Sequence, residues 1–302
     1  MDQSSEIREF LCTRRAKITP EQAGLPAMGR HRRVPGLRRE EVALLAGISV
    51  EYYARLERGK LQGASDAVLD AVARALRLDE AEQAHLRDLA RTAHTGAARR
   101  VPRRGRPQPL RPTLQYLLDA MTEAPAFIRN GRLDILAINR LGRALYAPAL
   151  TGSAHPANLA RFRFLDPAAA DFYADPDNTA HSTVALLRTE VGRDPHNDDL
   201  TDLIDELSTR SEDFRTLWAT HDVRLHRTGA KTFHHPAVGP LRLAYEAMPL
   251  PTDPGLTLTA YTAEPGTASH ESLNLLASWG AALDLPDLPG PGAAPTMRTR
   301  TA

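Results

Sequence analysis

Between Arg38 and Lys60 the chain carries side chains whose chemistry suits contact with nucleobases and phosphates. An arginine can hold guanine through two hydrogen bonds, a glutamate accepts from the amino group of cytosine, and an apolar side chain can contact the methyl group of thymine. Arginine and lysine also bind phosphate without reading the base. Two arginines precede one helical pattern here, and two further basic residues follow a second pattern. These flanking cations would position a duplex, whereas the residues between them would read it.

Two short helical patterns within residues 36–59 would hold these side chains in place. The apolar positions at helical spacing are Val42, Leu45 and Ala46 in the first pattern and Tyr53 and Leu56 in the second. Gly47 stands where the chain must turn, and Ser49 stands where the next helix must begin. The serine hydroxyl can accept a hydrogen bond from the N–H of residue 51 or 52 and so cap that helix. The pattern predicts a helix-turn-helix, whose second helix enters the major groove.

The predicted DNA contacts follow from this arrangement. They are Arg38, Arg39, Ser49, Val50, Glu51, Tyr52, Arg55, Arg58 and Lys60. The alternative is that these charges form a solvated helix face, as most charge clusters do. The joint occurrence of turn, cap, apolar spacing and basic flanks favours DNA reading.

Composition and charge support a chain with more than one domain. The net charge is +1, but residues 1–112 carry an excess of Lys and Arg, and the rest carries the opposite excess. A basic module joined to an acidic one suits a protein whose first part meets phosphate. Helical patterns fill residues 5–95, including an expected helix start at Thr19-Pro20-Glu21. We therefore expect an all-α domain over 1–96, a Pro/Arg-rich basic linker over 97–112, and a disordered tail over 283–302.

Residues 113–282 predict a second domain of α+β type. Strand-like runs over 126–129 and 133–138 flank Asn130-Gly131, a strong hairpin signal. A helical middle follows, and alternating runs return at 223–225, 232–234, 241–245 and 256–262. An amphipathic stripe with Leu114, Leu117 and Leu118 precedes the sheet. The fold class expected is multi-domain, with an all-α helix-turn-helix domain and an α+β domain built on an antiparallel sheet.

If the second domain binds a small apolar molecule, aromatic and aliphatic side chains should line its pocket with a few polar anchors. The candidates are Phe127, Leu136, Ile138, Asn139, Arg161, Phe162, Phe164, Phe172, Leu187, Trp218, Phe233, His235, Tyr245 and Tyr261. Each apolar candidate can equally be plain core. Asn139 can instead cap the next helix, and Arg161, with Arg163, can hold an anion or be solvated.

Other functional classes find little support in the residues. A single cysteine, Cys12, excludes an internal disulfide and a multi-cysteine zinc site. His221, His226, His234 and His235 show no metal-binding motif, and no catalytic or nucleotide-binding motif is present. We expect no enzyme activity, no cofactor and no metal. No apolar run reaches the ~20 residues of a transmembrane helix, so we expect a cytoplasmic protein without a membrane partner, associated with the nucleoid when bound to DNA.

Several motifs resemble one family of bacterial regulators. They are Arg33–Ala43, Tyr52-Tyr53, Leu56–Gly59, Val68–Leu76, Ala124–Phe127, Asn139, His235-Pro236, Val238-Gly239 and Tyr261–Gly266. Together they resemble the actinobacterial MmyB-like branch of the XRE (lambda-repressor-like) regulators over about residues 5–282. Ala64 departs from the proline expected before Ser65. The resemblance implies that the second domain is a PAS-like ligand-binding domain that can hold a fatty acid.

The sequence therefore predicts a one-component transcription factor. We expect a homodimer that binds double-stranded DNA at an inverted repeat, because dimeric readers place two helices one DNA turn apart. A small, largely apolar ligand would shift the population between arrangements that fit and do not fit the operator. Two alternatives are a ligand-independent repressor whose second domain only dimerises, and an enzyme carrying a regulatory helix-turn-helix.

Overall fold

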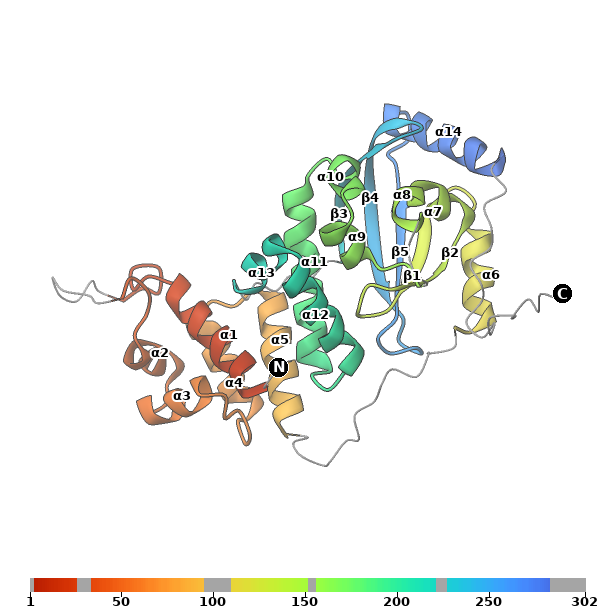
Figure 1. Ribbon diagram of the computed structural model, residues 1–302. Helices are drawn as coiled ribbons and strands as arrows, with labels where there is room; N and C mark the ends of the chain where they lie inside the picture. Colours follow the sequence, from red (N-terminus) through yellow and green to blue (C-terminus); the bar gives the residue numbers. More distant parts are fainter. Residues whose placement is uncertain (1–2, 26–33, 95–109, 152–155, 221–226, 283–302) are drawn as a thin grey trace. The chain divides into compact units, whose positions relative to one another are not determined.

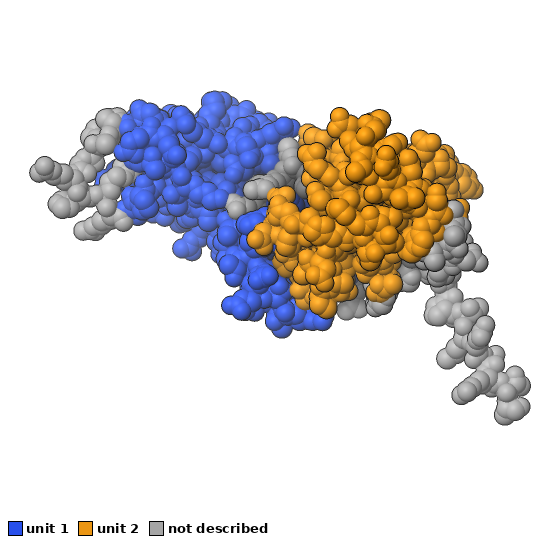
Figure 2. All heavy atoms as spheres, turned by 90° about the horizontal axis from the view of Figure 1, so that it is seen from above, with its two compact units in different colours: residues 1–104, 180–225 blue, residues 105–179, 226–302 orange. Residues whose placement is uncertain are grey.

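A computed structural model describes residues 3–25, 34–94, 110–151, 156–220 and 227–282. The chain divides into two compact units, residues 1–104 with 180–225 and residues 105–179 with 226–302 (Figure 2). Residues 180–225 thus group with the first unit, although the predicted second domain runs unbroken from 113 to 282. The predicted limits themselves stay predictions. Most of the expected linker, the expected strand at 223–225, His221, His226 and the tail lie outside the described residues.

Unit 1 consists of helices (Figure 1). They are α1 (Gln3–Lys17), α2 (Arg39–Ala46), α3 (Val50–Glu57), α4 (Asp66–Ala75), α5 (Glu80–His94), α11 (Pro176–Arg193), α12 (Asp198–Arg210) and α13 (Glu212–Trp218), of which α11 begins within unit 2. The predicted all-α character of the N-terminal region is confirmed. One buried apolar core joins the first five helices and includes Phe10, Val42, Tyr53, Leu56 and Leu69.

Two local expectations in this region are wrong. Leu45 is 37% exposed and Leu44 72%, and Ala43 takes the inward position beside Val42. Thr19-Pro20-Glu21 does not start a helix. Thr19 exchanges hydrogen bonds with Gln22 as a helix start would, but the chain makes only a turn that ends at Gly24, where φ is +76°. A left-handed residue so early leaves no room for a helix to propagate.

Unit 2 is built on a five-stranded sheet in the order β2-β1-β5-β4-β3, and every neighbouring pair is antiparallel (Figure 1). The strands are β1 (Ala126–Arg129), β2 (Ile135–Ile138), β3 (Thr228–His235), β4 (Gly239–Pro249) and β5 (Thr257–Thr262). Its helices are α6 (Pro112–Ala120), α7 (Arg140–Leu145), α8 (Ala147–Leu150), α9 (Leu159–Leu165), α10 (Ala168–Phe172) and α14 (Ala268–Ala282). The predicted α+β class with an antiparallel sheet is confirmed.

Alternation along β1 separates two apolar clusters. Phe127 joins an aromatic cluster, whereas Ala126 and Ile128 join a second cluster with Leu114 and Leu118 of α6. This division follows from the pleat, which sends successive side chains to opposite faces. Leu117 of α6 is half exposed, so its expected inward position is wrong. The sheet therefore presents two apolar faces, and only one of them is aromatic.

Candidate DNA-reading face and ligand site

The turn between α2 and α3 has the geometry that its sequence predicts. Gly47 ends α2 with φ +66°, a left-handed conformation that suits glycine. The N–H of Ile48 donates to the carbonyl of Ala43 at 3.0 Å, which closes the helix end. Ser49 caps α3, and its hydroxyl accepts from the N–H of Tyr52 at 3.1 Å. Residues 47–49 thus fix the start of α3 through local contacts alone.

The first turns of α3 present the predicted base-reading side chains. Val50 and Glu51 are exposed, and Tyr52 and Arg55 are half-buried. The Arg55 guanidinium lies over the Tyr52 ring, 4.7 Å from its centroid. This cation–π contact restrains both side chains on one face of the helix. The inward face holds Tyr53, whose pKa is raised by burial and by nearby Glu57.

The flanking cations differ in their surroundings. Arg38, Arg58 and Lys60 are exposed, and Arg38 lies 3.3 Å from the carboxylate of Glu40. Arg39 is also exposed on its outer side, but its Nε donates to Glu57 at 3.0 Å. A phosphate contact by Arg39 would therefore compete with a bond inside the protein. The DNA roles of all these residues stay predictions.

Glu57 is an important residue of this unit to which sequence reasoning gave no role. Its carboxylate is 1% exposed and accepts from Cys12 Sγ at 2.8 Å, Arg15 Nη2 at 2.8 Å and Arg39 Nε at 3.0 Å. Burial alone would raise the pKa of Glu57, but the hydrogen bonds from Arg15, Cys12 and Arg39 outweigh it and lower that pKa. Glu57 thereby ties the end of α3 to α1 and α2. Its place one turn after Tyr53 on the inward face was the available signal.

In unit 2 most of the predicted aromatic candidates come together with two rings that were not predicted, Tyr146 and Tyr173. The predicted members are Phe127, Phe162, Phe172, Phe233, Tyr245 and Tyr261, and we call the whole buried set the aromatic cluster. Its rings meet mostly edge to face or tilted, with centroids 5.2 Å apart for Phe172–Phe233 and 5.4 Å for Phe127–Tyr146. Such geometry is favourable for aromatic rings. Ile138 lies in the same core, as its candidate role requires.

A polar pair lies inside this apolar cluster. The hydroxyls of Tyr146 and Tyr261 are 2.6 Å apart, and both side chains are buried. Burial raises the pKa of each phenol, so both stay neutral and share a hydrogen bond. The pair joins α7–α8 to β5 across 115 residues of sequence.

Two cationic side chains adjoin the aromatic cluster. The Lys231 ammonium lies 5.3 Å from the centroid of the Tyr173 ring, and Arg129 is buried on β1. Burial, and then the charge of Arg129, lower the pKa of Lys231 to about 8. Arg129 also opposes the upward shift in the pKa of Tyr146 and of Tyr261, whose main cause is burial. Neither cation was among the sequence candidates, because nothing local marks a strand lysine as inward.

An open groove lies beside the cluster. It has a volume of about 600 Å³ and is lined by Pro148, Ala168, Asp171, Phe172, His234, His235, Pro236, Gly239 and Pro240. This volume falls within the ~300–1,000 Å³ of small-molecule sites. The side chain of Phe172 therefore borders both the groove and the aromatic cluster.

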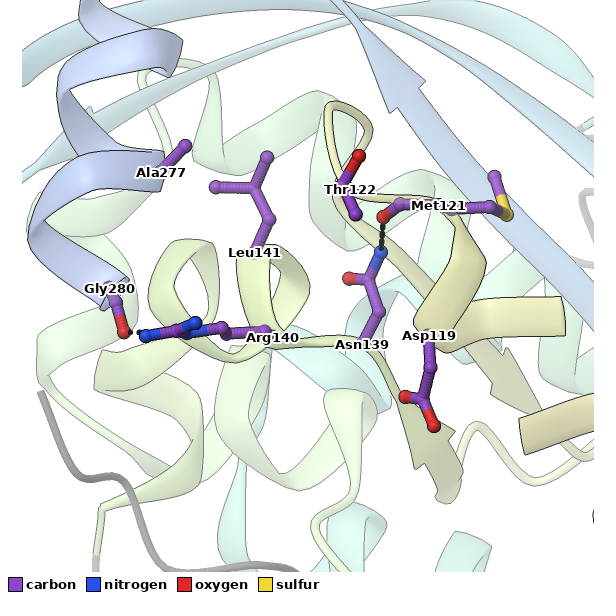
Figure 3. Close-up of a pocket in the computed structure, with 8 residues that line it drawn as sticks. All are labelled: Asp119, Met121, Thr122, Asn139, Arg140, Leu141, Ala277 and Gly280. Carbon is purple, nitrogen blue, oxygen red and sulfur yellow. Dashed lines mark hydrogen bonds between the residues drawn. The ribbon is translucent and has the colours of Figure 1, made fainter. Parts of the chain in front are cut away.

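Two polar candidates are fully used by the fold. The Asn139 amide donates to the carbonyls of Met121 and Ala124 and accepts from the N–H groups of Ala126 and Gly142. Asn139 lines a second pocket, of about 370 Å³ (Figure 3), but as the cap of α7 it has no polar atom to spare. His235 Nε2 lies 3.0 Å from the carbonyl oxygen of Ala144, and Nδ1 accepts from the N–H of Ala237. Burial lowers the pKa of His235, so a neutral ring that donates from Nε2 fits both bonds.

The remaining candidates lie away from the aromatic cluster. Leu136 packs with α6 on the other face of the sheet, and Arg161 is exposed. Phe164 is half-buried beneath the guanidinium of Arg163. Trp218 lies in unit 1, stacked on Phe214, and Leu187 is buried in the same unit. Their ligand roles stay predictions. Among the described residues, no group of three or more His, Cys, Asp or Glu side chains could hold a metal ion.

Comparison with known families decides the classification. Residues 110–276 match the MmyB-like transcription regulator ligand binding domain. The chain belongs to the MmyB-like family of transcription regulators. Residues 14–86 of this regulator match a helix-turn-helix domain, which includes α2, the turn and α3. Both families are domains of transcription regulators rather than of enzymes. No curated protein matches the regulator, and none of its described helices could span a bilayer.

Proposed function

We propose that the regulator binds an operator through the outer face of α3 and acts as a homodimer on an inverted repeat in the bacterial cytoplasm. The observation that supports this is the start of α3, where Ser49 caps the helix while Val50, Glu51, Tyr52 and Arg55 remain accessible or partly accessible. A preorganised helix N-terminus with an arginine fork suits major-groove reading.

The operator can be found by selection from a random duplex pool with the full-length protein. Enrichment of a sequence with two symmetric half-sites about 10 bp apart would support the proposal. An unsymmetric single site, or no enrichment over the starting pool, would contradict dimeric reading.

For the ligand we propose an apolar chain with an anionic head, of the fatty-acid class, bound against the PAS-like sheet. The aromatic cluster supplies apolar surface, and Lys231 with Arg129 supplies positive charge beside it. Lys231, Phe233 and His235 share one face of β3 at alternate positions. Four residues of strand span about 13 Å, so a chain with its head at Lys231 can extend past Phe233 toward the groove.

Native mass spectrometry of the purified protein is the first test, followed by titration with dodecanoate and with uncharged dodecan-1-ol. We expect dodecanoate to bind at least tenfold more tightly, and Lys231→Met to weaken it by about 10–100-fold through loss of a charge-assisted hydrogen bond. Equal binding of acid and alcohol would contradict an anion site. Failure of both to bind, with no co-purifying mass, would favour the alternative, a ligand-independent repressor whose second domain only dimerises.

The dodecanoate affinity should also depend on pH in one direction. Because the pKa of Lys231 is lowered to about 8 in the free protein, its ammonium loses its proton as the pH rises above that value. A bound carboxylate favours the protonated form, so binding takes up protons there. Affinity should be flat between about pH 6 and 7 and fall up to tenfold per pH unit above about 8. The Lys231→Met protein should lack this fall.

A further inference from the structure

Arg188 of α11 is a fully buried arginine in unit 1, held by residues of two other helices. Its Nη1 lies 2.5 Å from Oε1 of Glu6 on α1, and the two side chains are 0% and 2% exposed. Its Nη2 donates to the backbone carbonyl of Trp218 at the end of α13. The guanidinium also lies 4.0 Å from the centroid of the Trp218 ring. One side chain from the matched ligand-binding region is thus enclosed between α1 and α13.

A close approach beside this pair needs a glycine. His85 of α5 is fully buried, 3.9 Å from Glu6 Oε1, with its ring against Phe10 at 5.0 Å. A Cβ on Gly192 of α11 would come within 2.5 Å of two atoms of the His85 ring. Because His85 packs against Phe10, its ring has little freedom to move aside. Any larger residue at 192 would therefore hold α11 away from α5.

The energetics of this contact favour specificity over stability. Burial lowers the pKa of Arg188 even though Glu6 opposes that shift. Desolvation of a buried ion pair commonly cancels its Coulombic gain, whereas loss of one partner leaves a buried charge uncompensated. An apolar contact of the same size would hold α1 and α11 together equally well. The ion pair instead demands one partner in one position.

Helix α1, which carries Glu6, is also the helix that holds the DNA-reading helix. Glu57 at the end of α3 accepts from Cys12 and Arg15 of α1. A Cβ on Gly59, just after α3, would come within 2.5 Å of the Ser4 carbonyl oxygen. Both ends of α1 are therefore fixed against the end of α3, and a displacement of α1 must displace α3.

At its other end α11 begins beside the proposed ligand site. Arg163 donates through Nε and Nη2 to the carbonyl of Pro176, the first residue of α11, at 3.0 and 2.8 Å. Just before it, Tyr173 pairs with Phe233 on β3 and lies under Lys231. One continuous helix thus leads from Pro176 to Arg188.

We propose that α11–α13 form an internal docking surface for the DNA-reading domain, and that the Glu6–Arg188 pair is the contact through which the ligand-binding region acts on α3. The partner of this surface is the chain's own α1 and α5. The docking itself does not depend on which ligand binds, whereas its regulatory use rests on the proposed ligand function.

Hydrogen exchange of the full-length protein tests the docking without a ligand. Arg188→Met should speed exchange of amides in α11–α13 and α1 by about tenfold or more and leave β1 and β5 unchanged. Arg193→Met is the matched control, because this exposed arginine on the same helix pairs only locally, with Glu190. The double variant Glu6→Leu/Arg188→Met should recover much of the lost protection, because it removes both buried charges.

Gly192→Ala gives an independent test that keeps both charges. Alanine forms helix better than glycine. If α11 did not dock against α5, the α11 amides of the Gly192→Ala protein would therefore exchange more slowly than those of the wild type. Docking predicts faster exchange in both α11 and α5. Slower or unchanged exchange in Gly192→Ala would overturn the proposal, even if Arg188→Met lost protection throughout the chain.

The regulatory step is tested on the selected duplex with dodecanoate as probe. In the wild type, the coupling is the ratio of the DNA affinities measured with and without dodecanoate. In Arg188→Met this ratio should be about one, while the affinity for dodecanoate stays unchanged. An unchanged ratio would overturn the coupling. If dodecanoate does not bind the wild type, the ligand proposal fails, and the exchange results still decide the docking.

Discussion

The outer face of α3 and the aromatic cluster of unit 2 are assembled in opposite ways. The α3 face comes from four residues within one short segment, 50–55, held by a cap and a turn next to them. The cluster gathers buried rings from Phe127 to Tyr261, which lie on four strands, on α9 and α10 and at helix ends. A substitution on the α3 face should therefore change recognition, whereas one in the cluster should first change stability.

Phe233→Ala tests the expectation that a substitution in the aromatic cluster lowers stability, and it should give the largest change in the free energy of unfolding. Phe233 is fully buried and meets Tyr146, Phe172, Tyr173 and Tyr261. Its truncation should lower the free energy of unfolding by about 3–5 kcal/mol, measured by urea unfolding of the full-length protein. Tyr52→Ala on α3 is the comparison and should cost under about 1 kcal/mol. Similar losses in both variants would remove the distinction.

Gly59→Ala should be next, because it disturbs the support of the α3 face rather than the face itself. Gly59 has φ +88°, and its Cβ would meet the Ser4 backbone. Strain and overpacking together should cost on the order of 3 kcal/mol of stability. Gly47→Ala is the matched control: it also has positive φ, +66°, but open space around the Cβ, so about 1–2 kcal/mol is expected. Thermal unfolding of both proteins checks the difference.

Arg55→Ala should weaken binding to the selected operator by about 1–3 kcal/mol and leave binding to random duplex DNA nearly unchanged. The reason is that Arg55, restrained over Tyr52, can offer a two-pronged fork to a guanine. Competition titrations measure both affinities. Arg58→Ala should instead weaken both about equally and reduce the salt slope by about one. Equal losses from Arg55→Ala would place Arg55 on the backbone.

The contrast between local and long-range contacts also explains which features could be predicted from the sequence. The roles of Gly47 and Ser49 were predictable, because caps and turns act through bonds spanning at most five residues. The inward positions of Tyr53 and Leu56 were predictable from their helical spacing. The hairpin at Asn130-Gly131 is local in the same way. The inward positions of Leu45 and Leu117 were wrong, because periodicity does not say which apolar side of a short helix the other helices cover.

Long-range partners gave no such signal. Lys231 alternates on its strand like any exposed lysine, and only the fold brings it to Tyr173. Trp218 is aromatic like the cluster residues, yet it lies on Arg188 in the other unit. Helix α11 continues the helical pattern of the second domain, and nothing in its composition shows that it packs with α1 and α5. Contacts of this kind depend on the whole fold and not on a motif.

The Tyr146–Tyr261 pair tests whether the cluster is held by packing alone or also by the buried hydrogen bond between these two rings. Either single Tyr→Phe change leaves the other buried hydroxyl without the 2.6 Å hydrogen bond and should cost about 1–3 kcal/mol. The double change removes both hydroxyls and should cost less than either single change, because no polar group then loses its partner. Urea unfolding of the four proteins of the cycle gives the coupling. Additive costs would mean that each hydroxyl acts through other contacts, and the cluster would then be held by packing alone.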